Sequence, residues 1–185
     1  MVLFSMINKA VRYVQEKRRA KYIAALISHG LKLGKNVSII DTFYFDPSHC
    51  FLISIGDNCT ICPNVRLIAH DASTKKILGY TKIGRIDIKE NCFIGDSAIV
   101  LPHVSIGPHS IVGAGSVVTR SIPPQTIAAG NPAKVISKVD DYVKKIQDIR
   151  NKKKVFSEEY YIQNLNDVKK EEMIRSIGES IGFIV

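Results

Sequence analysis

Five histidines are the side chains of this 185-residue sequence best suited to proton transfer at neutral pH, because imidazole titrates at about pH 6.5. His70 differs from the others in its place, since it follows the stretch LIA at the point where a regular apolar pattern breaks off. His103 and His109 each follow an apolar residue of that pattern by three positions. No supporting motif surrounds His29 or His49. His70 is therefore the histidine to which chemistry is most readily assigned.

The four cysteines are the second group that could do chemistry. Cys59 and Cys62 form a C-x-x-C pair, a spacing that elsewhere signals zinc or redox chemistry. No second pair completes a zinc site, and these two residues, like Cys92, occupy regular positions of the apolar pattern. We interpret all three as structural, which disfavours a cysteine nucleophile. Cys50 fits no position of the pattern.

The elements that must position these residues repeat every six positions. Six residues make one short strand and a corner, and three such units close a triangular coil in which the apolar residues stack as an interior ladder. Small residues and glycines at fixed offsets permit the corners. The ladder residues form two blocks, Ile55, Ile61 and Leu67, then Ile88, Ile94, Val100, Ile106, Val112 and Val118. The sequence predicts a mainly β protein built on a parallel β-helix.

Two stretches break this rhythm. Leu67 and Ile88 are 21 residues apart, which is not a multiple of six, so an inserted loop at 70–82 must leave the coil. Loops on a rigid scaffold commonly carry function, and this one begins at His70. The stretch DTFYFDPSHC (41–50) also departs from the pattern; Tyr44 and Asp46 in it either line an acceptor site for hydroxyl groups or help to cap the coil.

Helical spacing flanks the repeats and ends near Gly30 at the N-terminal side. We predict an N-terminal helical segment at 1–32, a β-helix domain at 33–137 and a helical C-terminal tail at 138–185.

The chain is basic, with 26 Lys and Arg against 17 Asp and Glu and a formal charge of +9. We interpret the runs KRRAK and RNKKK as solvated helix faces, and the sequence has no nucleic-acid-binding motif. No apolar run reaches the length of a membrane span, although peripheral contact of the basic N-terminal helix with a membrane stays open. The sequence shows no signal-peptide pattern, so we expect the four cysteines to be reduced thiols and not a disulfide framework. Both expectations favour a cytoplasmic location.

The closing stretch VGAGSVVTRSIPPQTIAAGNPAKVI (112–136), together with the ladder, resembles the hexapeptide-repeat acyltransferases. Residues 33–137 are most similar to the branch of maltose, galactoside and cell-surface-sugar O-acetyltransferases. The resemblance implies a left-handed β-helix, a homotrimer, and acetyl-CoA as co-substrate in a groove between neighbouring protomers. It also implies transfer to a carbohydrate hydroxyl, such as one of a surface polysaccharide or its precursor.

The resemblance assigns roles to particular residues. His70 corresponds to the general base that takes the proton of the acceptor hydroxyl, with direct transfer and no covalent intermediate. Asp71 either orients its ring, binds the acceptor or is a turn residue. The positions matching contacts to coenzyme A are Asp96, Gly113, Ala114, Thr119, Arg120 and Lys134. Gly113 and Ala114 are small enough to let the backbone approach the pantetheine arm of coenzyme A. The positive charges of Arg120 and Lys134 suit its phosphates.

Other functions remain open. The acceptor can instead be an amino sugar, serine or a drug hydroxyl, and the chain can instead be a noncatalytic trimeric module. The gamma-class carbonic anhydrases share the repeat but need three histidines for zinc. His103 and His109 should lie on adjacent faces, and no triple has an evident common site, so we predict no metal.

Overall fold

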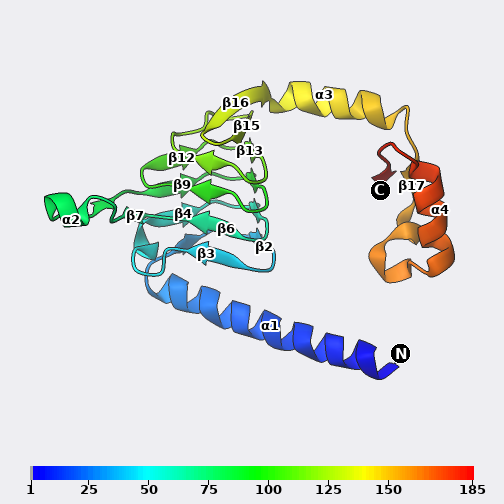
Figure 1. The fold of residues 1–185 in the computed structure, drawn as a ribbon, viewed down its shortest axis with the longest axis horizontal. Helices are drawn as coiled ribbons and strands as arrows, with labels where there is room; N and C mark the ends of the chain where they lie inside the picture. The colour runs from blue at the N-terminus through cyan, green and yellow to red at the C-terminus, as the bar shows by residue number, and fades with distance from the viewer. Residues whose placement is uncertain (1) are drawn as a thin grey trace. The chain divides into compact units, whose positions relative to one another are not determined.

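The computed structural model describes the backbone of residues 2–185 and the side chains of residues 13–185. Met1 and the side chains of residues 2–12, which belong to the predicted N-terminal helical segment, lie outside this part. The chain divides into two compact units, Met1–Val139 and Asp140–Val185. The first unit contains a parallel β-helix with a long N-terminal helix (Figure 1).

Three parallel sheets, here named walls A, B and C, enclose the β-helix. Wall A contains β1 (Lys32–Leu33), β4 (Ile53–Ile55), β9 (Ile86–Ile88) and β12 (Val104–Ile106). Wall B contains β2 (Ser38–Ile39), β5 (Thr60–Ile61), β10 (Phe93–Ile94), β13 (Ile111–Val112), β15 (Thr126–Gly130) and the antiparallel β16 (Ala133–Lys138). Wall C contains β3 (Phe43–Phe45), β6 (Val65–Leu67), β11 (Ile99–Val100) and β14 (Val117–Val118). The chain runs from A to B to C in every coil.

The predicted ladder forms the core. Ile94 pairs with Val112 on wall B, and Val100 pairs with Val118 on wall C, so residues eighteen positions apart stack coil upon coil. Every ladder residue of the two blocks is at most 2% exposed. The slim positions four residues later are buried as well, including Cys59 and Cys92. Equivalent positions of successive coils therefore stack in parallel, as the six-residue period predicts.

Most corners of the coil contain a residue with a left-handed backbone. The third residue after seven of the nine ladder positions has a left-handed backbone; the exceptions are His70 after Leu67 and Ser121 after Val118. His103 and His109 are two of the seven, with φ of 68° and 56°. Asparagine, which tolerates this conformation, holds the same place at Asn58, Asn64 and Asn91.

Both ends of the stack are covered. Helix α1 (Val2–Ser28) is followed by Gly30, whose φ of 101° lets the Leu31 N–H donate to the Leu26 carbonyl at 3.0 Å. Leu26 is 3% exposed and belongs to the core. The Cys50 thiol donates to the carbonyls of Leu26 and His29 at 3.6 Å, which explains this cysteine as a packing residue beneath the helix. The β15–β16 hairpin covers the other end.

Two excursions leave the coil at the corner between walls C and A, here named the C–A corner. The first follows β3 and contains the short 3-10 helix η1 (Cys50–Leu52). The second follows β6 and forms an arm of β7 (His70–Asp71), α2 (Lys75–Leu78) and β8 (Lys82–Ile83), which projects from the β-helix in Figure 1. Because Phe45 pairs with Leu67, the two excursions begin one coil apart at the same corner.

The second unit contains more than the predicted helices. Its elements are α3 (Val139–Arg150), β17 (Val155–Phe156), η2 (Glu158–Tyr160), η3 (Ile162–Asn164), α4 (Asp167–Ile177) and β18 (Phe183–Ile184). β17 and β18 form a parallel pair, and Phe156 is 2% exposed with its ring 5.0 Å from that of Tyr160. Long-range strand pairing of two such short segments has no periodic signal in the sequence.

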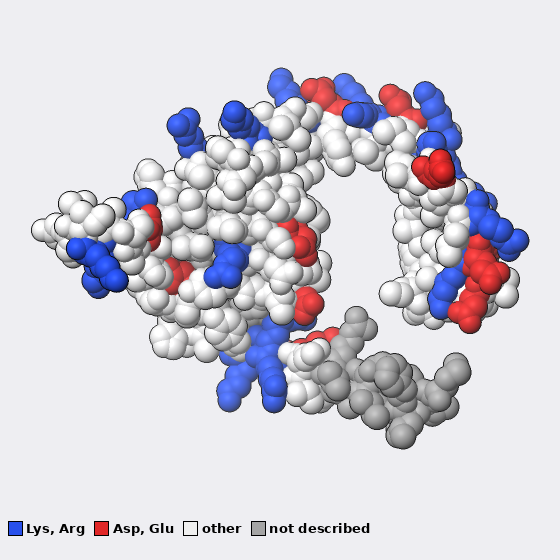
Figure 2. All heavy atoms as spheres, viewed as in Figure 1, with Lys and Arg blue, Asp and Glu red and all other residues white. Residues whose placement is uncertain are grey.

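Charge is unevenly distributed over each unit. Figure 2 shows few charged side chains on the visible face of the β-helix, whereas Lys and Arg gather over the described end of α1, and basic and acidic side chains are mixed on the C-terminal helices. Within the part of the chain that the structure describes, no helix is both long and apolar enough to cross a membrane.

Candidate active site

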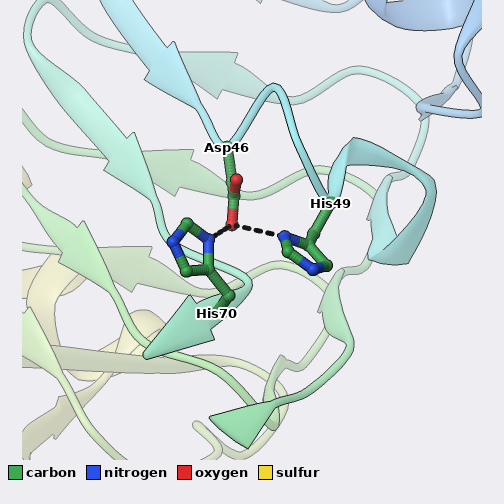
Figure 3. Close-up of side chains that lie close together, drawn as sticks. All are labelled: Asp46, His49 and His70. Atoms are coloured by element: carbon green, nitrogen blue, oxygen red, sulfur yellow. Dashed lines mark hydrogen bonds and ion pairs between the residues drawn. The ribbon is translucent and has the colours of Figure 1, made fainter. Parts of the chain in front are cut away.

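Asp46 and His70 meet at the C–A corner (Figure 3). The Nδ1 atom of His70 lies 2.5 Å from Oδ2 of Asp46, across 24 residues of sequence. Asp46 is fully buried, whereas the His70 side chain is 30% exposed. The same Oδ2 accepts a hydrogen bond from the Ala69 N–H at 3.1 Å, and Oδ1 accepts one from the Ser48 hydroxyl at 3.1 Å. The carboxylate is thus fixed from three sides.

The protonation of this pair follows from its surroundings. Burial by itself would raise the pKa of Asp46, but the hydrogen bonds from His70 and Ser48 and the two nearby imidazoles outweigh it and lower the pKa below its usual range. Asp46 is therefore an ionised acceptor, so the Nδ1 of His70 carries the ring proton. The Nε2 of His70 is left with its lone pair free to accept a proton.

His49 is a third member of this cluster. Its Nδ1 lies 3.8 Å from Oδ2 of Asp46, and its ring centroid lies 4.9 Å from that of His70. The Nδ1 atom is buried and has no hydrogen-bond partner among the residues that the structure describes. Figure 3 shows both imidazoles directed toward one carboxylate. One ligand atom from each of the three residues lies within 4.8 Å of the others, a set that could hold a metal ion.

The other candidate acceptor residues lie elsewhere. Asp71 turns away from His70: its carboxylate lies 3.0 Å from the Lys82 ammonium and accepts the Ser73 N–H at 3.0 Å. These contacts fasten the base of the arm. Tyr44 lies on wall C, and its ring packs against the guanidinium of Arg66, 4.8 Å from the ring centroid.

The residues matched to coenzyme A contacts fall at two corners of one protomer. Asp96, Gly113 and Ala114 lie between walls B and C, and Lys134 is beside them because it pairs with Ala129 above Gly113. We name this place the B–C corner. Thr119 and Arg120 instead follow β14 at the C–A corner, the corner that carries His70 two coils away.

A separate cleft of about 840 Å³ lies between α1 and the first coil. Arg18, Arg19 and Tyr22 line it from the helix, and Ile40 and Phe43 line it from the coil. None of the three residues of the histidine cluster belongs to its lining.

The repeats of this chain are similar to those of known hexapeptide-repeat proteins. Residues 85–120 match the family described as bacterial transferase hexapeptide, six repeats. A Schizosaccharomyces pombe relative is 41% identical over 115 residues, which cover 58% of this chain and 56% of that protein.

Two further similarities point to one branch. The galactoside O-acetyltransferase of Escherichia coli is 37% identical over 117 residues, covering 58% of this chain and 57% of that protein. The crystal structure of a maltose O-acetyltransferase from Clostridium difficile aligns with a TM-score of 0.50 and 29% identity, over 62% of this chain and 72% of that one. These similarities confirm the predicted resemblance to the hexapeptide-repeat acyltransferases and the predicted fold class, a mainly parallel β-helix with helices before and after it. The chain spans 56% to 57% of the length of these curated relatives.

Only part of this cluster is predictable from the sequence. The register break predicts His70, and the stretch 41–50 predicts Asp46 as an acceptor residue, but no pattern joins the two or gives His49 a role. The available signal was the first break in rhythm, at 41–50, which contains both Asp46 and His49.

Proposed function

We propose that this protein is an acetyl-CoA-dependent O-acetyltransferase that acts on a carbohydrate hydroxyl. The observation that carries the proposal is the Asp46–His70 pair, in which a buried carboxylate orients a partly exposed imidazole whose Nε2 is free. The similarity to galactoside and maltose O-acetyltransferases supports the choice of a sugar acceptor, such as a unit of a surface polysaccharide.

His70 acts as the general base in this mechanism. Its Nε2 takes the proton of the acceptor hydroxyl as the oxygen attacks the thioester carbonyl, and Asp46 stabilises the imidazolium that results. When the carbon–sulfur bond breaks, His70 returns the proton to the leaving thiolate. The products are an acetyl ester and coenzyme A thiol, and no residue of the protein is acylated.

The candidate contacts to coenzyme A suit its chemistry. Arg120 and Lys134 are exposed, and neither forms an ion pair within the described residues, so both are free to meet phosphates. Ala114 and Gly113 offer a corner with little side-chain bulk for the pantetheine arm. Asp96 suits this role least, because its carboxylate accepts the Ser97 hydroxyl at 2.6 Å and would repel phosphate.

The test is the release of thiol from acetyl-CoA in the presence of a panel of sugars. We expect His70→Ala to lower kcat by about 10²- to 10⁴-fold, because the acceptor loses its base. His109→Asn is the matched control, since asparagine occupies equivalent corners in this chain. Full activity in the His70 variant would rule out the mechanism, and failure to bind acetyl-CoA by calorimetry would instead favour the noncatalytic trimeric module.

The homotrimer, the cytoplasmic location and peripheral membrane contact through α1 remain part of the proposal. The four cysteines are free thiols in the structure. Lys17, Arg18, Arg19 and Lys21 give α1 the charge that contact with an anionic surface needs.

A further inference from the structure

We propose that Asp46, His49 and His70 form a binding site for a zinc-class divalent cation, and that the cation switches off the base. The inhibitory part rests on the proposed function, whereas the binding part does not. Two imidazoles and one carboxylate are a ligand set that zinc prefers, and in this protein they converge on one point.

The buried Nδ1 of His49 is the observation that carries the site. A buried ring nitrogen without a hydrogen-bond partner is costly, and this one is directed at a carboxylate that lies too far away, at 3.8 Å, to bond it. Neither Ser48 nor Ala69 relieves it, because both donate to Asp46. A cation between the three ligand atoms would satisfy the nitrogen.

The two distances from Asp46 are close to those of a zinc site, and the ligand atoms of the two imidazoles lie within 4.8 Å of each other. Tetrahedral coordination with bonds of about 2.0–2.1 Å places ligand atoms roughly 3.3 Å apart. The Asp46–His70 distance of 2.5 Å would open and the Asp46–His49 distance of 3.8 Å would shorten, each by less than about 1 Å. Both imidazoles are partly exposed, at 30% and 27% of the side chain, so rings can adjust and water can take the fourth position.

The fixed carboxylate supplies the outer support that such sites need. Asp46 is held by the Ala69 N–H and the Ser48 hydroxyl, whose hydrogen bonds orient it and leave lone pairs on Oδ2 for a cation. The ionised carboxylate is the only acidic ligand of the set and offsets part of the charge of the cation.

Cation binding has a definite effect on the base. His70 would coordinate through Nδ1, so its ring proton shifts from Nδ1 to Nε2 with no net loss of a proton. An Nε2 that carries hydrogen cannot accept the proton of an acceptor hydroxyl. The cation therefore inhibits transfer through the tautomer of His70, and a chelator restores activity.

The binding test uses metal-free full-length protein and a colorimetric zinc indicator. We expect one Zn²⁺ per protomer, and Co²⁺ should give the visible d–d absorption of tetrahedral coordination. His49→Gln should weaken binding by at least about tenfold, because it removes one of three protein ligands. His109→Asn, at an exposed corner, should bind as the wild type does. Thermal melting of each variant checks that it is folded.

The inhibition test measures each variant against its own rate without metal. Zn²⁺ should inhibit the wild type reversibly, and the inhibitory concentration should rise at least about tenfold in His49→Gln. Equal zinc affinity in wild type and a folded His49→Gln variant overturns the site. Zinc bound with unchanged transfer overturns the inhibition. Zinc binding in a protein that transfers no acetyl group upholds the site and rejects the proposed function.

Discussion

At the scale of single residues, the pairing of Asp46 with His70 decides which ring nitrogen is basic. Oδ2 of Asp46 receives both the Ala69 N–H and the His70 Nδ1, so an oxygen is required at that position. Among the side chains of residues 13–185, the Ser48 hydroxyl is the partner of Oδ1, and a hydroxyl can donate or accept. Replacement by asparagine can therefore keep the geometry and remove the charge alone.

Asp46→Asn separates orientation from electrostatics. The amide oxygen can occupy the Oδ2 place and the amide NH₂ can donate to Ser48, so His70 keeps its tautomer. We expect kcat to fall by about tenfold, because a neutral acceptor stabilises the imidazolium by about 1.4 kcal/mol less than a charged one. The KM for acetyl-CoA should not change. Steady-state kinetics with both substrates measure the two effects.

Asp87→Asn is the control for that change, since Asp87 lies on wall A in a 3.9 Å surface ion pair with Lys89. It should keep both constants. Equal kcat values for Asp46→Asn and the wild type would mean that the charge of Asp46 plays no part in transfer.

At the scale of the elements, spacing between coils explains the glycines better than corner conformation does. Gly56 follows ladder residue Ile55 and has an ordinary negative φ. A Cβ built on it would lie 2.7 Å from the backbone nitrogen of Glu90 and 2.8 Å from the carbonyl carbon of Lys89. Gly115, by contrast, has a φ of 66° with open space around it. The two glycines are needed for different reasons.

Gly56→Ala should therefore destabilise the β-helix by about 1–3 kcal/mol, because backbone of the next coil must move. Gly115→Asn should change stability by less than about 0.5 kcal/mol, since asparagine tolerates a left-handed corner and meets no neighbour. Urea unfolding at one fixed protein concentration compares the midpoints. A larger loss for Gly115→Asn would contradict this explanation.

At the scale of the whole molecule, the β-helix separates the groups that transfer needs. His70, Thr119 and Arg120 lie at the C–A corner, while Ala114 and Lys134 lie at the B–C corner. Wall C lies between them, with about five strand residues or roughly 15 Å from corner to corner. A groove between two protomers would bring one corner of each together, and this geometry supports the proposed homotrimer.

Mixed oligomers test that arrangement. His70→Ala and Lys134→Ala each lack one half of the proposed site, so each alone should be impaired. If one site takes His70 from one protomer and Lys134 from its neighbour, every trimer that contains both variants keeps one of its three sites intact, so about one third of the activity should return. Co-expression of the two variants with different tags, followed by thiol-release assays on the doubly purified oligomer, measures the recovery. No recovery would indicate that each protomer carries a complete site.

Much of the fold was predictable because its signal is periodic and local. Ladder residues such as Ile94 and Val100 recur every sixth position, and each packs against the ladder residues of the neighbouring coils, as Ile94 does with Val112 and Val100 with Leu67. The stop of the N-terminal helix near Gly30 was predictable for a similar local reason. Glycine readily adopts the positive φ that ends a helix, and Gly30 has a φ of 101°. The β17–β18 pair was not, because two-residue strands far apart in sequence leave no period.

The site shows the same division. The sequence by itself determined that His70 stands where the register breaks, since 21 residues cannot fit a period of six. Only the tertiary structure decided that Asp46 and His49 lie against it. The physical reason is that β3 and β6 pair in parallel, so the excursions that follow them begin one coil apart at the same corner. This stacking brings Asp46 and His70, which are 24 residues apart in the sequence, within hydrogen-bond distance.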